Sequence, residues 1–154
     1  MTARIVVVGE INIDVHLYGV AGQPQSPPLL VDHYITEPGG KGANVARAAS
    51  RLGAEVRLIA RVGDDGNGRA CVDAIRADGV DVASVIVTPG EPTGYVAIKL
   101  DDGRHRSLVY VPGANRSLTW DDVAPALADL GRGDVLVVQA EIPPATLGAI
   151  VERT

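Results

Sequence analysis

The chain has 154 residues, of which 46% are hydrophobic and 21% are charged, enough for one domain with its own core. A net charge of -5, without any cluster of lysines and arginines, argues against a nucleic-acid partner. The apolar run at 5–8 is too short for a signal peptide or a membrane span, and the single Cys71 excludes an internal disulfide. We therefore expect a cytoplasmic protein with no membrane partner and with a buried structural thiol.

Helical and extended patterns alternate along most of the chain. Continuous β-branched runs are typical of strands buried on both faces, and Gly53 and Gly79 end the first two helical patterns. In chain order we expect strands at 5–8, 15–18 and 29–36, a helix at 42–52, a strand at 56–62, a helix at 67–78, strands at 85–88, 93–100 and 106–111, a helix at 119–130, a strand at 135–138 and a helix at 143–153. This order predicts an α/β fold with three α/β/α layers around a parallel sheet.

Four of these strands interrupt the alternation, and we expect them to form a small antiparallel sheet set apart as a lid. They lie at about 15–18, 29–36, 93–100 and 106–111, with a Gly/Pro-rich loop at 19–28 and a hairpin-type turn at 101–103. The strand at 135–138 would leave the main sheet with an apolar edge, which we take to indicate a fold that continues beyond these residues.

Two polar residues follow the first buried strand. Asn12 and Asp14 are two apart on an extended segment, so their side chains point the same way. Open α/β sheets bind ligands beyond the carboxyl ends of their strands, and one carboxylate accepts hydrogen bonds from two neighbouring hydroxyl groups. The pair therefore suits a vicinal diol; the alternative is a turn-forming pair.

A glycine-rich stretch, GGKGAN at 39–44, precedes the first predicted helix. Three glycines let a backbone pass close to a ligand, and Asn44 at the helix start offers hydrogen bonds to hydroxyl groups. It is not a P-loop, because Gly42 follows Lys41 where a Ser or Thr should stand. Lys41 is either solvated or faces an anionic group. Together with Asn12 and Asp14, the stretch predicts a site for a polyhydroxylated small molecule.

Glu141 follows the strand at 135–138, again on the ligand edge of the sheet. It could equally be an acid that serves the dipole of the next helix. Asn115 is more typical of a turn than of a ligand contact. His16, His33 and His105 lack metal-type spacing, so we expect surface or lid residues and no metal site.

Several motifs together resemble the ribokinase family, also called the PfkB carbohydrate kinases. GGKGAN at 39–44, RLG at 51–53 and RVGDDGNG at 61–68 resemble its N-terminal signature, and GEINID at 9–14 resembles its first-strand motif. PGAN at 112–115 and QAEIP at 139–143 resemble ribokinase more than most relatives. The resemblance covers essentially the whole chain, so 1–154 is expected to be the N-terminal part of a ribokinase-like kinase domain.

The resemblance implies transfer of the ATP γ-phosphate to a terminal hydroxyl of a small sugar, with ribose as the first choice and fructokinase or nucleoside kinase specificities open. The GGKG form also occurs in 1-phosphofructokinases, but Asn12-Ile13-Asp14 favours an unphosphorylated sugar. The residues that the resemblance places against the sugar are Asn12, Asp14, Gly40, Lys41, Asn44 and Glu141. It further implies that the lid doubles as a homodimer contact, although residues 24–28 depart from the usual Pro-Gly-Glu-Thr.

For the complete enzyme the resemblance implies ATP, Mg²⁺ and a monovalent cation. It assigns the aspartate base, the nucleotide pocket and the cation site to a C-terminal half whose D-T-x-G-A-G-D signature this sequence does not contain. We therefore expect no catalytic residue or ATP site within these residues, and no activity unless another chain supplies that half. The alternatives are a non-catalytic sugar-binding or dimerisation module, or a product without a stable fold.

Overall fold

The computed structural model describes residues 3–19, 30–101 and 105–154. Three predicted features lie wholly or mostly outside these ranges. They are the segment 24–28, which departs from the usual Pro-Gly-Glu-Thr, the loop at 19–28 and the turn at 101–103. Within them, no helix has the length and apolar character needed to cross a membrane. The elements in chain order are β1 (Arg4–Val8), β2 (Asn12–Tyr18), β3 (His33–Gly39), α1 (Lys41–Arg51), β4 (Glu55–Gly63), α2 (Gly66–Ala77), β5 (Val85–Thr88), β6 (Gly94–Asp101), β7 (His105–Val111), the 3₁₀ helix η1 (Gly113–Ser117), α3 (Trp120–Leu127), β8 (Val135–Val138) and α4 (Pro144–Arg153).

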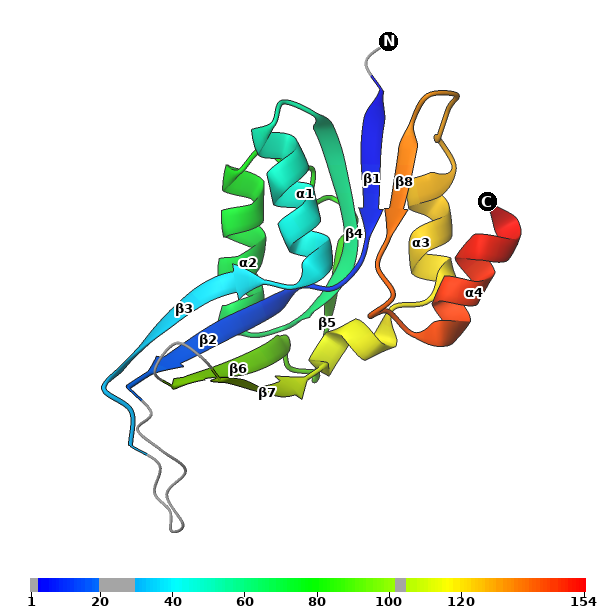
Figure 1. Cartoon of the computed structure of the whole chain (residues 1–154). Helices are drawn as coiled ribbons and strands as arrows, with labels where there is room; N and C mark the ends of the chain where they lie inside the picture. Colours follow the sequence, from blue (N-terminus) through cyan, green and yellow to red (C-terminus); the bar gives the residue numbers. More distant parts are fainter. Residues whose placement is uncertain (1–2, 20–29, 102–104) are drawn as a thin grey trace.

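Four parallel strands form the central sheet, in the order β5-β4-β1-β8. Helices α1 and α2 cover one face, and α3 and α4 cover the other (Figure 1). Alternate residues of β1 serve different cores: Val7 belongs to the core that includes Ile75 of α2, whereas Val6 belongs to the core that includes Val123 of α3. The predicted three-layer α/β/α architecture with a parallel sheet is confirmed.

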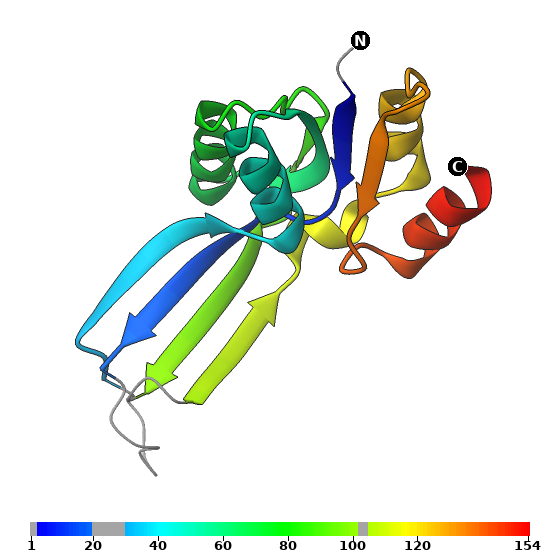
Figure 2. The ribbon, with the colours of Figure 1, turned by 45° about the horizontal axis from the view of Figure 1, so that its top comes forward.

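The remaining four strands form the lid, a second sheet in the order β3-β2-β6-β7 that extends away from the central sheet (Figure 2). The prediction of an antiparallel lid is wrong at its centre, because β2 and β6 are parallel, with Asn12 opposite Gly94. The reason is that β2 and β6 both run outward from the body, whereas β3 and β7 return the chain to it. Only the outer pairs, β2 with β3 and β6 with β7, are antiparallel.

Two lid strands differ in extent from the prediction. β2 begins at Asn12 rather than at residue 15, so the predicted ligand residues Asn12 and Asp14 are themselves part of the lid. β3 spans His33–Gly39 rather than 29–36, and residue 29 lies outside the described ranges. It includes Pro38, which an edge strand tolerates because one side of the strand needs no N–H donor.

Helix α3 begins as predicted and ends early. The Asp122 carboxylate accepts hydrogen bonds from Thr119 N and Oγ1 at 2.8 and 2.9 Å, in a capping box that begins the helix. Pro125 has no N–H to donate, and beyond it Ala128 N donates to the Pro125 carbonyl in a tighter turn. The helix therefore ends at Leu127 rather than at residue 130.

The N-terminus of α1 lies directly against the link between β1 and β2. A Cβ added at Gly42 would stand 2.7 Å from Gly9 Cα and 2.9 Å from Glu10 N, and both of these atoms are backbone. Ala43 N donates to the Glu10 carbonyl at 3.2 Å. The contact is backbone on backbone, so Gly42 leaves no room for any side chain.

We expect Gly42→Ala to destabilise the chain by about 1–3 kcal/mol, the usual cost of overpacking a tight contact. Gly148→Ala is the matched control: it also lies in a helix, but nothing stands within 4 Å of its added Cβ. That variant should be stabilised by up to about 1 kcal/mol through helix propensity. Denaturant unfolding measures the change in the free energy of unfolding for both variants. Equal changes in the two variants would contradict the packing argument.

Candidate sugar-binding site

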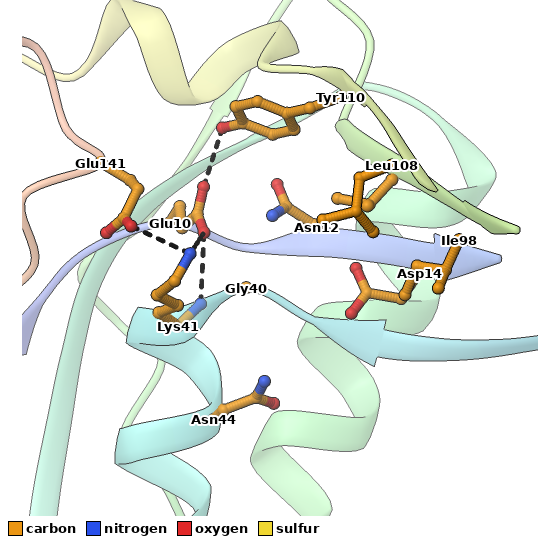
Figure 3. A pocket seen from close by; sticks show the side chains of 11 residues that line it. Glu10, Asn12, Asp14, Gly40, Lys41, Asn44, Ile98, Leu108, Tyr110 and Glu141 are labelled. Carbon is orange, nitrogen blue, oxygen red and sulfur yellow. Dashed lines mark hydrogen bonds and ion pairs between the residues drawn. The ribbon is translucent and has the colours of Figure 1, made fainter. Parts of the chain in front are cut away.

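A pocket of about 400 Å³ lies where the lid meets the carboxyl ends of β1 and β8 and the start of α1 (Figure 3). Its volume is within the range of small-molecule sites, roughly 300–1,000 Å³. β1 has β4 on one side and β8 on the other, so the pocket lies at the point where the strand order reverses. Its lining comprises all six predicted residues, Asn12, Asp14, Gly40, Lys41, Asn44 and Glu141, together with Glu10, Val96, Ile98, Leu108 and Tyr110.

Asp14 presents a carboxylate oxygen that has no partner. Its Oδ1 is buried and accepts no hydrogen bond in the described structure. Burial is the largest cause that raises the pKa of Asp14, and the neighbouring carboxylates of Glu37 and Glu10 add to it. Gly39 makes room for this carboxylate, because a Cβ there would collide with the Asp14 side chain. Asp14 is therefore held in the pocket with unused capacity to accept hydrogen bonds.

The three glycines of the GGKG stretch have three different neighbours. Gly39 accommodates Asp14, and Gly42 accommodates the backbone of Gly9. Gly40 has a φ of +93°, and a Cβ there would stand 2.6 Å from the Glu10 carbonyl oxygen. Only Gly40 lines the pocket, so the expectation that all three let the backbone approach a ligand is too broad. Two of them pack the chain against itself.

Lys41 faces anionic groups, which is one of the two alternatives that the sequence left open for this residue. Its Nζ lies 2.9 Å from Glu141 Oε1 and 3.9 Å from Glu10 Oε1. The hydrogen bond to Glu141 raises the pKa of Lys41, and the same bond lowers the pKa of Glu141. Both groups stay charged at neutral pH, and the ammonium partly offsets the negative charge of the pocket.

Glu10 and Tyr110 are pocket residues that the sequence reasoning missed. Glu10 is only 3% exposed; its Oε1 accepts from Lys41 N at 3.3 Å and its Oε2 accepts from Tyr110 Oη at 2.8 Å. Burial and this bond to Glu10 raise the pKa of Tyr110. Glu10 stands two residues beyond β1 and Glu141 three residues beyond β8, so the rule that found Glu141 would also have found Glu10. Tyr110 and Leu108 are two apart on β7 and therefore share a face of the lid, but the sequence does not tell which face that is.

Cys71 lies behind the pocket rather than in it. The thiol is fully buried in α2, and its Sγ is 3.4 Å from the Asn12 carbonyl oxygen. Burial raises the pKa of Cys71 to about 11, so it remains a neutral thiol at physiological pH. The expectation of a buried structural cysteine is confirmed.

The charges of the pocket suit a neutral, hydroxylated ligand. Three carboxylates (Glu10, Asp14 and Glu141) face one ammonium (Lys41). This surplus of negative charge does not fit a nucleotide triphosphate, and the described residues include no group of three or more His, Cys, Asp or Glu placed to hold a metal ion. The pocket offers acceptors for hydroxyl groups and, from Ile98 and Leu108, an apolar wall for the carbon side of a ring.

We expect Asp14→Asn to stabilise the unliganded chain at pH 7 by about 1 kcal/mol, because the amide fills the same space without the negative charge that burial and the neighbouring carboxylates disfavour. Because the pKa of Asp14 is raised in the folded chain, its ionisation costs stability at any pH above that raised pKa. Below the pKa of the unfolded chain, about 3.9, the carboxyl group is protonated in both states and the cost is absent. The gain should therefore disappear as the pH falls below about 4. Denaturant unfolding of both proteins between pH 3 and 8 measures it, and a loss of stability at pH 7 would contradict the unpartnered carboxylate.

Comparisons with known proteins agree with this arrangement. A model of the pfkB family of carbohydrate kinases matches residues 2–154. Ribokinase of Bacillus subtilis is 34% identical over 147 residues, which cover 96% of this chain and 50% of that protein. The ribokinase structure from Giardia lamblia superposes with a TM-score of 0.88 at 27% identity, covering 98% of this chain and 49% of the other.

A ribokinase from Arabidopsis thaliana, solved with ribose and ATP, superposes with a TM-score of 0.81 at 28% identity, covering 93% of this chain and 47% of its own. The chain thus spans about half the length of these relatives. Similarity over nearly all of its residues, in both sequence and fold, leaves one conclusion: the chain belongs to the pfkB family of carbohydrate kinases.

Proposed function

We propose that this chain forms the sugar-binding side of an ATP-dependent kinase that phosphorylates a terminal hydroxyl of a small sugar, with ribose as the first choice. The observation that carries the proposal is the unpartnered Asp14 carboxylate in a pocket with Asn12 on the same face of β2. The ribokinases among the relatives, one of them solved with ribose and ATP, support ribose as the substrate.

The pocket residues divide the work of holding a sugar. Asp14 accepts hydrogen bonds from two neighbouring hydroxyl groups, and the amides of Asn12 and Asn44 donate to hydroxyl oxygens. Leu108 and Ile98 pack against the C–H groups of the ring. The surplus of carboxylates repels a phosphorylated sugar, so the acceptor is an unphosphorylated one.

The proposal assigns ATP, Mg²⁺, the monovalent cation and the catalytic base to residues outside this chain. Phosphoryl transfer requires groups that neutralise the transferring phosphate and a base near the acceptor hydroxyl. The pocket carboxylates are engaged by the sugar or by Lys41, and the pocket is too negative for a triphosphate. We infer that the 154 residues hold the sugar without transferring phosphate to it unless a C-terminal half is supplied, in the same protein or on another chain.

Calorimetric titration tests the sugar site directly. The chain should bind ribose, should bind ribose 5-phosphate more weakly, and should show no heat with Mg-ATP. Asp14→Asn should lower the ribose affinity about tenfold to hundredfold, since the amide no longer accepts at both oxygen positions and each tenfold corresponds to ~1.4 kcal/mol.

The matched control is Asp73→Asn, which makes the same chemical change at an exposed carboxylate on α2 and should leave the affinity unchanged. Undiminished ribose affinity in Asp14→Asn would overturn the site. Binding of Mg-ATP by the chain would overturn the division between the two halves.

The lid also supports the expected homodimer, which we propose as a second property of the chain. Helix α2 contacts β2 and β3 near the body, and no helix of the described structure lies over the outer part of the lid (Figure 2). On its pocket-facing side the register places Ile35, His16, Ile98 and Leu108 side by side across the four strands, and Ile35 and Leu108 are 49% and 62% exposed. The exposed apolar side chains at the two edges of this row, Ile35 on β3 and Leu108 on β7, suit a second copy of the same surface.

We expect Ile35→Lys to shift the chain toward monomer, because the pairing lids would bury the added charge. Leu52→Lys is the control, since Leu52 is 90% exposed at the end of α1, outside the lid. Sedimentation velocity over a range of concentrations measures the association of both variants and of the unmodified chain. A chain that sediments as a monomer at every concentration would contradict the dimer.

A further inference from the structure

Asn115 is a buried amide that the proposed function leaves unexplained. It lies in η1, is 3% exposed, and is far in sequence from β2. Its Oδ1 accepts from Ile11 N at 3.1 Å, and its Nδ2 donates to Ile11 O at 3.0 Å and to Pro112 O at 3.0 Å. A third interaction of Nδ2, with Asn12 Oδ1 at 2.9 Å, reaches a side chain of the pocket.

The contact between the two amides determines which way Asn12 points. The hydrogen bond from Ile11 N fixes Asn115 Oδ1, so Nδ2 is the atom that faces Asn12, and a donor can face only the oxygen of the Asn12 amide. The two hydrogens of Nδ2 are shared among this oxygen and the Ile11 and Pro112 carbonyls. The Asn12 nitrogen is then left free, and the described residues provide it with no acceptor. In Figure 3 this nitrogen points toward the side of Gly40 and Asn44, and the oxygen points away from them.

Gly94 keeps the space in which the two amides meet. It stands opposite Asn12 in the parallel pairing of β2 with β6, and a Cβ there would collide with both Asn12 Oδ1 and Asn115 Nδ2. The amide pair is therefore enclosed by η1, β2 and β6. Of the three residues that meet here, Asn12 lines the pocket, whereas Asn115 and Gly94 do not.

We propose that Asn115 is a positioning residue that holds the Asn12 amide with its N–H groups toward the sugar. The inference rests on the proposed function, since it concerns the same site. Its consequence is chemical: Asp14 and Glu141 present only acceptors, so a reversed Asn12 would add another acceptor and remove a donor. A sugar hydroxyl that donates to Asp14 keeps its oxygen free to accept, and the fixed Asn12 supplies the donor for such an oxygen.

A ligand-free measurement tests the orientation without reference to any sugar. In the unmodified chain, the side-chain amide hydrogens of Asn115 should exchange slowly with water, since they are hydrogen-bonded and buried, and those of Asn12 should exchange faster. In Asn115→Asp the carboxylate accepts instead of donating, so Asn12 should turn its N–H groups toward it and exchange more slowly. NMR of the side-chain amides records both rates. Asn12 hydrogens as protected as those of Asn115 in the unmodified chain would overturn the proposal.

A double-mutant cycle on ribose affinity separates positioning from a structural role. As a single substitution, Asn115→Asp should weaken ribose binding about tenfold. Added to Asn12→Ala, the same substitution should weaken binding less than about twofold, because its effect passes through Asn12. An equal loss in both backgrounds would mean that Asn115 only supports the fold, and would overturn the proposal.

Asn67→Asp is the control, the same change at an exposed position of α2, and should alter neither readout. If Asn115→Asp does not fold, the exchange rates of the unmodified chain still decide the orientation. If the unmodified chain binds no ribose, the proposed function fails while the exchange rates test the orientation independently.

Discussion

The approach of helix α1 to the link between β1 and β2 is the constraint on which the site depends. Gly42 lets the first turn of the helix lie against Gly9, and Ala43 N hydrogen-bonds the Glu10 carbonyl. The same approach puts Lys41 beside the Glu10 carboxylate and opens Asn44 toward β2. A side chain at Gly42 would push the helix outward and separate the two halves of the pocket. This close packing of backbone on backbone therefore sets the geometry of the pocket.

The polar pocket is destabilising for the unliganded chain, and the apolar cores of the body offset this cost. Asp14 keeps an unpartnered carboxylate oxygen, and three carboxylates share a small pocket with a single lysine. The body below them has apolar cores on both faces of the central sheet. Helix α2 packs on the base of the lid, and the described residues provide no second layer over its outer part. The base is also tied to the body by the hydrogen bond from Arg47 Nη1 to the Pro38 carbonyl. A ligand in the pocket or a second copy of the lid would cover the side chains that this sheet leaves exposed.

Local patterns predicted the body and most of the site because the deciding information is local. Asn12 and Asp14 share a face by strand alternation, and Glu141 follows a parallel strand whose carboxyl end must lie at the ligand edge of the sheet. The mixed lid sheet was not predictable in this way, since the relative direction of β2 and β6 depends on how both leave the body. Asn115 was interpreted as a turn residue because its partners lie 103 and 104 residues earlier in the chain.

Glu10 shows why the lid and the body act as one site. Its two carboxylate oxygens accept from different elements, one from the first N–H of α1 and the other from Tyr110 on β7. The end of β1 thus holds both the helix start and a lid strand through a single buried side chain, with Lys41 placed between it and Glu141. The start of α1 and the strand β7 are therefore both attached to the end of β1 through one buried side chain that belongs to neither of them.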